Sequence, residues 1–269
     1  MCSNVLTHQR AVWSRNFRFS RLISAHIPVV EKAASTTVTT TSMKPLKPFA
    51  GFSRAGLNFV ADLSERDKTW FSQNRSVYDS EVVPQAKAFA LELGELLAAR
   101  VSGGIEYRPK TNGSICPINN DMRFRPDVAP YRDYQMFKFW EGPTKKSSPM
   151  FLVRVNVFDG IGFAARMAFN DVDRWRDAVD RFGDAFAENL DALIPAANAE
   201  LVGAQLKRVP KPYAEGHPRG DLLRRKIFQV RWTKQTPSSI TTPGFADWCA
   251  HELERAAPIH QWLVEHVGL

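Results

Sequence analysis

Residues 150–158 depart from the helical spacing of the segments on either side of them. Their sequence, M-F-L-V-R-V-N-V-F, alternates apolar and polar side chains, which is the pattern of a strand with one buried face. Residues 134–140 and 162–168 alternate in the same way, and Asp159 and Gly160 provide a turn between the last two of these segments. We predict an antiparallel meander of three strands in the middle of the chain.

Apolar residues at helical spacing precede this block. Ser53 is a candidate N-cap for a first helix, and Asp67 stands before a second helical segment. Pro84 interrupts the pattern, and a further apolar stripe then runs to Arg100. The part of the domain ahead of the strands is therefore predicted to be helical.

A long helix follows the predicted strands. Asp171 or Asp173 would cap its first turn, and apolar residues including Phe182 recur every three or four positions along it. Pro195 would close the helix, because a proline removes a backbone donor and clashes with the preceding turn.

Two further segments complete the chain. Residues 221–233 fit either a helix or a strand, and residues 243–267 are helical with a break at Pro258. Helices on both sides of a central antiparallel block indicate the α+β class. We predict a single compact α+β domain, residues 49–269, with a central antiparallel sheet flanked by helices.

Residues 1–48 differ in composition from this domain. They hold seven Lys or Arg against one Glu and include a Thr/Ser-rich stretch at 35–42. We expect a disordered extension outside the fold. A segment rich in Arg and poor in acids is typical of an organellar leader sequence. The alternative, which we favour, is an untranslated or dispensable stretch ahead of a start at Met43.

The net charge of +8 belongs mostly to that extension. Residues 49–269 hold 29 Lys or Arg and 27 Asp or Glu, so the predicted domain is nearly neutral. Affinity for nucleic acid rises with the number of phosphates that a protein neutralises, so this balance argues against a nucleic-acid partner. No apolar run is long enough to cross a bilayer, and we expect no membrane partner.

The three cysteines are isolated in sequence and form neither a disulfide framework nor a zinc spacing. They fit a reducing compartment, so we expect a soluble cytoplasmic protein, or a mitochondrial matrix protein if the extension is a leader. The histidines near the C-terminus lack partners at ligand spacing, which predicts no metal site. Glycine-rich phosphate loops and nucleophile elbows are absent from the sequence, so we expect no cofactor. Catalytic residues, and whether the protein is an enzyme, are left open.

The segment 119–132, N-N-D-M-R-F-R-P-D-V-A-P-Y-R, is the most unusual in the chain, and its prolines prevent a regular helix. Guanidinium groups match phosphate or carboxylate oxygens in pairs, so the segment is a candidate anion pocket. The alternative, slightly favoured, is an Arg and Asp network that fixes the loop. The candidate ligand-binding residues are Asp121, Arg123, Arg125, Tyr131 and Arg132.

The segment 207–226 is a second cation-rich loop, marked by Pro and Gly. Lys207 and Arg208 are candidates to hold a phosphate, and His217 is a candidate for proton transfer near neutral pH. The alternative, given about equal weight, is that these cations pack against the acidic residues of segment 159–200.

Three motifs occur in order along the chain. They are R-D-K-T-W-F at 66–71 with Tyr78 and Pro84, D-M-R-F at 121–124 with P-Y at 130–131, and L-K-R-V-P-K-P-Y at 206–213 with His217, Pro218, Leu222, Leu223 and Lys226. Together they resemble domain-of-unknown-function family 2461, over about residues 49–269. The resemblance implies no activity, because none is established for that family.

The chain departs from the family pattern in the central motif. The family usually has an Arg before Asp121 and a Lys after Asp127, where this chain has Asn120 and Val128. Each lost phosphate contact weakens binding of a polyanion, so any such binding by this loop would be weaker than in relatives.

The two cation-rich loops together predict a pocket for a phosphate or carboxylate group, with a small anion or another protein as the partner. A non-catalytic protein-interaction module is the alternative, and it predicts a broad exposed patch without a deep cleft. A weaker alternative is a groove for single-stranded nucleic acid, with Tyr131, Phe137 and Trp140 as stacking platforms.

Overall fold

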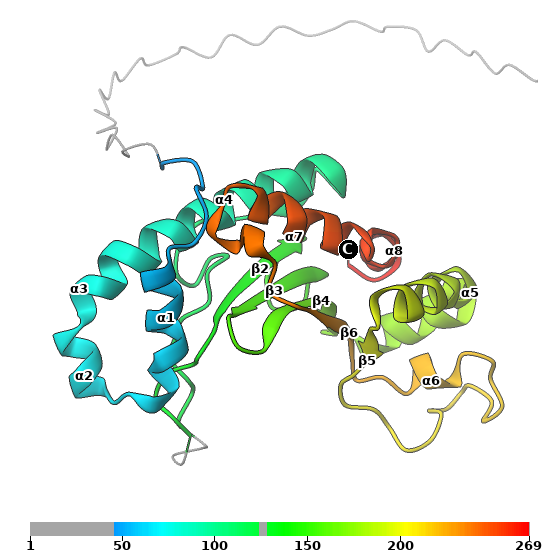
Figure 1. Ribbon diagram of the computed structural model, residues 1–269. Helices are drawn as coiled ribbons and strands as arrows, with labels where there is room; N and C mark the ends of the chain where they lie inside the picture. Colours follow the sequence, from blue (N-terminus) through cyan, green and yellow to red (C-terminus); the bar gives the residue numbers. More distant parts are fainter. Residues whose placement is uncertain (1–45, 124–127, 269) are drawn as a thin grey trace, which may run out of the picture. The chain divides into compact units, whose positions relative to one another are not determined.

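A six-stranded antiparallel sheet in the order β1-β2-β3-β4-β6-β5 is the centre of the fold (Figure 1). The computed structural model describes residues 46–123 and 128–268. The strands are β1 (Ile105–Glu106), β2 (Gln135–Glu141), β3 (Met150–Asn156), β4 (Gly160–Ala168), β5 (Glu200–Leu201) and β6 (Ile227–Lys234). Strands β2, β3 and β4 are the predicted meander, and helices around an antiparallel sheet confirm the α+β class.

Strand β3 is shorter than its alternating sequence. It ends at Asn156, whose side-chain oxygen accepts hydrogen bonds from the backbone N–H groups of Phe158 and Asp159, at 2.8 and 3.0 Å. This side-chain turn competes with the strand ladder. It places the β3–β4 turn two residues earlier than the pattern predicts.

Eight helices and three short turns surround the sheet in the described part of the chain. The helices are α1 (Arg54–Asp62), α2 (Lys68–Gln73), α3 (Arg75–Val77), α4 (Val83–Arg100), α5 (Val172–Ala197), α6 (Gly220–Leu223), α7 (Gly244–Glu254) and α8 (Ala257–His266). The 3₁₀ turns are Leu63–Glu65 and Ser238–Thr241, and a π turn is Tyr78–Val82. The segment 221–233, which fitted a helix or a strand, contains most of α6 and all but the last residue of β6.

Side-chain caps begin three of these helices where the sequence predicts them. Ser53 accepts from the N–H of Gly56 at 3.0 Å, and Asp67 accepts from that of Trp70 at 2.7 Å. Asp171 caps α5 by accepting from the N–H groups of Asp173 and Arg174.

The predicted end of α5 is wrong by two residues. Pro195 lies inside the helix, which ends at Ala197; the C-cap residue Asn198 has a left-handed φ of 53° and its N–H donates to the carbonyls of Ile194 and Pro195. Phe182 also departs from prediction. It is 49% exposed and stacks on His266 at 4.6 Å between ring centroids.

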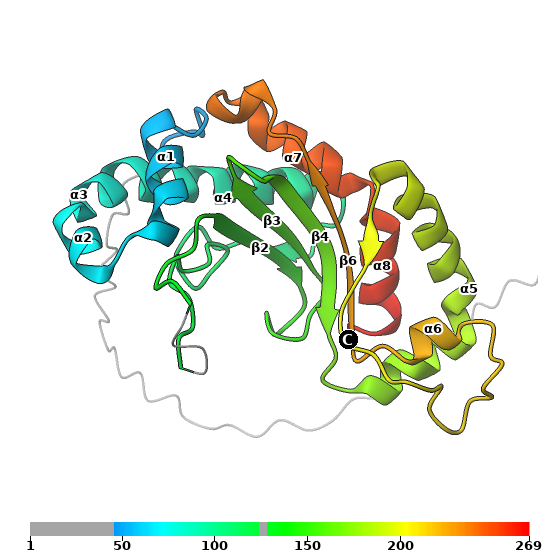
Figure 2. The same ribbon diagram turned by 60° about the horizontal axis from the view of Figure 1, so that its bottom comes forward.

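The larger helices cover one face of the sheet, and each meets a different central strand through an aromatic contact. The pairs, with ring-centroid distances, are Phe89 of α4 with Phe137 of β2 (4.7 Å), His260 of α8 with Phe151 of β3 (4.5 Å), Trp248 of α7 with Phe163 of β4 (5.6 Å) and Phe186 of α5 with Phe228 of β6 (5.0 Å). All these side chains on the strands are at most 2% exposed, so this face is the core. The helices therefore lie on one side only, and Figure 2 shows the opposite face without a described helix across it.

A buried polar contact joins the core helices to the sheet. Glu141, the last residue of β2, accepts from the hydroxyl of Ser102 at 2.6 Å and pairs with Nε2 of His260 at 2.9 Å. These two hydrogen bonds hold the pKa of Glu141 below its ordinary value, against the effect of burial. None of the described helices combines the length and apolarity needed to span a membrane.

Candidate functional site

The loop before β2 is fixed by its own polar groups. Arg123 donates to both carboxylate oxygens of Asp121, at 2.9 and 2.6 Å, and lowers the pKa of that carboxyl to about 2. Both side chains are more than half exposed. The predicted site residue Arg125 lies outside the described residues.

The other two candidates of this loop contact the protein interior. Tyr131 is 5% exposed and packs on Phe71 at 4.8 Å between ring centroids. Arg132 donates to the side-chain oxygen of Asn120 at 3.2 Å and to the carbonyl of Pro117 at 3.3 Å. Asn120 in turn donates to two carbonyls of the same loop, including that of Tyr131. These contacts favour a network that holds the loop in place.

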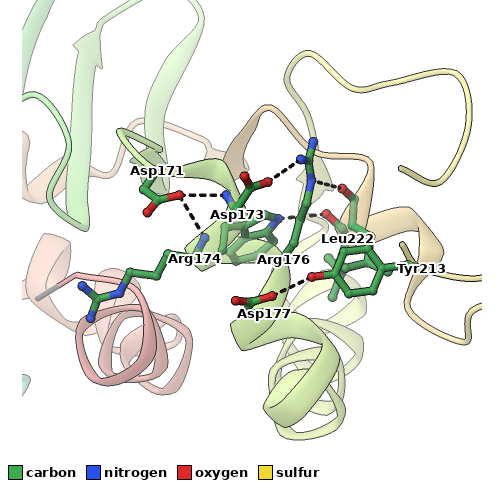
Figure 3. A network of polar contacts seen from close by, with 9 residues as sticks. Asp171, Asp173, Arg174, Arg176, Asp177, Tyr213 and Leu222 are labelled. Carbon is green, nitrogen blue, oxygen red and sulfur yellow. Dashed lines mark hydrogen bonds and ion pairs between the residues drawn. The ribbon is translucent and has the colours of Figure 1, made fainter. Parts of the chain in front are cut away.

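The second cation-rich segment lies along α5 (Figure 3). We call residues 206–224 the clamp segment. Its Tyr213 donates to Asp177 at 2.8 Å, and burial, together with this contact, raises the pKa of Tyr213 to about 12. The carbonyl of Leu222 accepts from the indole N–H of Trp175 at 3.0 Å.

Two more acids of α5 bind the clamp segment. His217 Nε2 lies 3.0 Å from Asp180, and Arg219 Nε donates to Asp184 at 2.8 Å. The acids of α5 recur at helical spacing, so one side of the helix faces one row of partners. His217, a candidate for proton transfer, is therefore bonded to a structural carboxylate.

Lys207 and Arg208 are exposed and line a shallow cavity of about 270 Å³ beside His217. The predicted pocket would join them to Asp121 and Arg123. The loop before β2 lies near α1 and α2 in Figures 1 and 2, and the clamp segment lies beside α5 and α6 on the other side of the sheet, so the structure does not bring the two segments together.

The uncovered face of the sheet carries one cation from each central strand. The ladder aligns Lys138, Leu152, Ala164 and Arg231 in one row across β2, β3, β4 and β6. Arg154 and Gly162 stand side by side in the row on one side, and Arg166 with Gln229 in the row on the other. At the usual strand spacing, Lys138 and Arg231 are about 14 Å apart at their Cα atoms. We call this surface the open face.

Small and apolar side chains form the floor between these cations. Leu152, Gly162 and Ala164 lie at its centre, and a cavity of about 590 Å³ opens over them. Its walls include Arg154 and Arg231. This volume is within the range of small-molecule sites.

The arginines of the open face differ in their partners. Arg154 donates to Asp159 at 2.7 Å, and Arg231 donates to Glu200 at 2.6 Å. Arg166 has no hydrogen-bond or ion-pair partner within residues 46–123 and 128–268, and burial lowers the pKa of its guanidinium. A desolvated charge without a counterion is a place where an anion gains more than it does in water.

The open face continues to a second group of cations at the β2 edge. Trp140 lies between Arg108 and Lys145, whose charged groups are 5.4 and 5.6 Å from its ring centroid. Burial, with the charges of Lys138 and Arg108 close by, lowers the pKa of Lys145. Cations therefore gather on this side of the molecule although the domain is nearly neutral.

The proposed stacking platforms are not displayed on a surface. Phe137 is fully buried on the core face, and Trp140 and Tyr131 are 3% and 5% exposed. A base could stack on these rings only after the side chains around them moved.

Sequence reasoning missed the open face as a site. Its cations come from four separate strands, and strand alternation assigns each one to a solvated face. The one local signal is G-F-A-A-R at 162–166, where Gly162, Ala164 and Arg166 share a face with unusually small side chains. No group of three or more His, Cys, Asp or Glu side chains is placed to hold a metal ion among the residues described.

Comparisons with known proteins identify a family without a named activity. The family model described as "Conserved hypothetical protein (DUF2461)" matches residues 55–262, a range that includes all six strands. No curated protein and no solved structure matches the chain. The match confirms the resemblance carried by the three motifs. The chain belongs to the DUF2461 family of conserved hypothetical proteins.

Proposed function

We propose that the protein binds a ligand bearing a phosphate or carboxylate group in the cavity of the open face. The observation that carries the proposal is the cavity over Leu152, Gly162 and Ala164, whose walls include Arg154 and Arg231 and whose neighbouring strand positions carry Lys138 and Arg166. An anion in this cavity could contact Arg154 or Arg231 directly, within the field of the cations beside them.

The ion pairs on two of the arginines support this use. Each carboxylate holds one edge of a guanidinium, and a guanidinium has five N–H donors. Arg154 and Arg231 therefore keep donors for a ligand while their positions are restricted by Asp159 and Glu200. Restriction before binding lowers the entropy lost when the ligand binds.

The clamp segment is a weaker place for the same function. Its histidine and Arg219 are bonded to acids of α5, and its cavity has less than half the volume of the one on the open face. Lys207 and Arg208 are exposed, and, unlike Arg154 and Arg231, neither is held by an ion pair within the described residues.

A protein-interaction module receives less support from the described surface. The large apolar side chains exposed there are Leu46, Phe158 and Phe182. They lie before α1, in the β3–β4 turn and in α5, respectively, so they come from three separate elements. Single exposed apolar residues of this kind are common and do not indicate a partner.

Isothermal titration of the protein with inorganic phosphate and with citrate at low ionic strength tests the proposal. We expect saturable binding that weakens as salt is added. Arg154→Ala and Arg231→Ala should each raise the Kd about tenfold or more, because each removes a charge-assisted hydrogen bond and frees a carboxylate that repels the anion.

Arg208→Ala is the matched control, because it removes an exposed cation of the clamp segment and leaves the open face intact. It should leave the Kd unchanged. Loss of binding in this variant, with normal binding in the two open-face variants, would place the anion on the clamp segment and refute the proposal.

A further inference from the structure

Uncharged polar groups line the cavity of the open face together with its arginines. Asn198, Gln229 and Thr233 supply amide and hydroxyl groups, and Asn198 is held in the left-handed conformation that ends α5. Groups that both donate and accept hydrogen bonds suit hydroxyls, which also do both. A simple anion such as phosphate mainly accepts hydrogen bonds, so the acceptor oxygens of these groups would have no donor on such a ligand.

Glu200 is the one acid among the described residues that line this cavity. Its Oε1 accepts from Arg231, and its side chain is 59% exposed, so Oε2 remains available. A carboxylate here repels an anionic group that comes close, but it accepts hydrogen bonds from hydroxyl groups. The cavity is therefore divided between cations and one hydroxyl-accepting carboxylate.

The floor does not offer a surface on which a nucleobase could stack. Phe163 and Trp232 line the cavity, but their side chains are 2% and 3% exposed and share the core side of the ladder. The accessible floor consists of the partly exposed Met136, Leu152 and Gly162, which suits the carbon atoms of a small saturated ligand.

We propose that the ligand is a phosphorylated sugar or polyol, with its phosphate on Arg154 or Arg231 and its hydroxyls on Glu200, Gln229 and Asn198. This inference rests on the anion-binding function proposed above and specifies the ligand class of the same cavity.

The test is isothermal titration of the full chain with inorganic phosphate, glucose 6-phosphate, glucose and adenosine monophosphate. We expect glucose 6-phosphate to bind at least about tenfold more tightly than inorganic phosphate, the gain expected from two added hydrogen bonds. Adenosine monophosphate should bind no more tightly than glucose 6-phosphate, because its base finds no ring to stack on.

Glu200→Ala gives effects of opposite sign on two of these ligands. Removing the carboxylate releases Arg231, so inorganic phosphate should bind more tightly. The preference for glucose 6-phosphate over inorganic phosphate should shrink, because a hydroxyl acceptor is lost. Glu188→Ala, which removes an exposed acid of α5 that does not line the cavity, should change neither affinity.

The outcomes distinguish the proposed ligand class from the anion-binding function on which it rests. Binding of phosphate without a preference for glucose 6-phosphate overturns the ligand class and leaves anion binding standing. Tighter binding of adenosine monophosphate also overturns it, in favour of a nucleotide. Failure of every ligand to bind overturns both proposals, and the measurements on the unaltered chain give this answer even if a variant does not fold.

Discussion

The clamp segment and the open face both contain several cations, but these cations differ in how fully they are paired with acids of the protein. Along α5, Arg219 and the imidazole of His217 each meet one acid of the helix, and the contact joins two parts of the fold. On the open face, Arg166 meets no acid of the described chain, and the acids beside Arg154 and Arg231 leave part of each guanidinium uncovered. Cations thus stabilise the fold where a row of acids lies opposite them. Where strand alternation places them on an uncovered face, part of each charged group remains exposed.

The largest effect should come from the anchor of the clamp segment. Trp175 is fully buried and donates to the carbonyl of Leu222, so Trp175→Ala creates a cavity and leaves that carbonyl unpaired. We expect the free energy of unfolding to fall by about 3–5 kcal/mol, measured by urea denaturation. Trp175→Phe keeps most of the volume and should cost less. A loss below about 1 kcal/mol in the alanine variant would show that the clamp is not structural.

The buried pair of Glu141 and His260 should contribute more to stability than the exposed ion pairs at the surface. The pKa of Glu141 lies below its ordinary value of 4.5, so its stabilising effect is complete above pH 4.5 and is lost as the pH falls through the lowered pKa. Glu141→Gln should lower stability by about 1–3 kcal/mol at neutral pH. It should also flatten the acid side of the stability profile, measured by thermal unfolding from pH 7 to 2. Glu95→Gln, at an exposed position of α4, should leave that profile unchanged.

Tyr213→Phe removes a single hydrogen bond between the clamp segment and α5. We expect stability to fall by about 1 kcal/mol, with the Kd for phosphate unchanged. Urea denaturation and isothermal titration on the same sample measure both quantities. A weaker affinity for phosphate would show that the clamp segment and the open face are energetically coupled, and would contradict the separate roles described here.

Alanine at Arg154 or Arg231 should give the reverse pattern. Both pairs are partly solvated, so the free energy of unfolding should change by no more than about 0.5 kcal/mol. Phosphate binding should be strongly weakened in the same variants. Urea denaturation without phosphate separates a true binding defect from partial unfolding.

The smallest effect should be at the exposed pair of the loop before β2. Arg123→Ala removes the guanidinium that lowers the pKa of Asp121, so that pKa should rise from about 2 toward its ordinary value of 3.8. The change can be followed by NMR titration of the side-chain carboxyl. An unchanged pKa would mean that the pair does not persist in solution.

The sequence predicted the meander and the helix caps, because each leaves a local pattern. It left the pairing of the second cation-rich loop with acidic residues open, as an alternative of about equal weight to anion binding. It could not predict β1 and β5, because two residues are too few to show alternation. It placed the end of α5 at Pro195, since a proline is a general helix breaker, while Asn198 ends the helix through its left-handed conformation.

The open face could not be predicted for a different reason. Lys138 and Arg231 are 93 positions apart in the chain and lie in one row of the sheet only because β6 pairs with β4. That pairing depends on tertiary packing, which one sequence does not reveal. The charges of the loop 119–132 are adjacent in sequence and therefore easy to recognise, and Asp121 and Arg123, two positions apart, pair with each other.

The two short outer strands, β1 and β5, also limit association between molecules through the edges of the sheet. Edges of a sheet carry unpaired N–H and C=O groups that can recruit a strand from another molecule. Here β1 and the backbone of Ser114 and Cys116 occupy the outer side of β2, while β5 and Val202 occupy the outer side of β6. Long strands are thus confined to the interior of the sheet, and its rims are brief and irregular. The described sheet therefore offers no long edge to which a strand of another molecule could add.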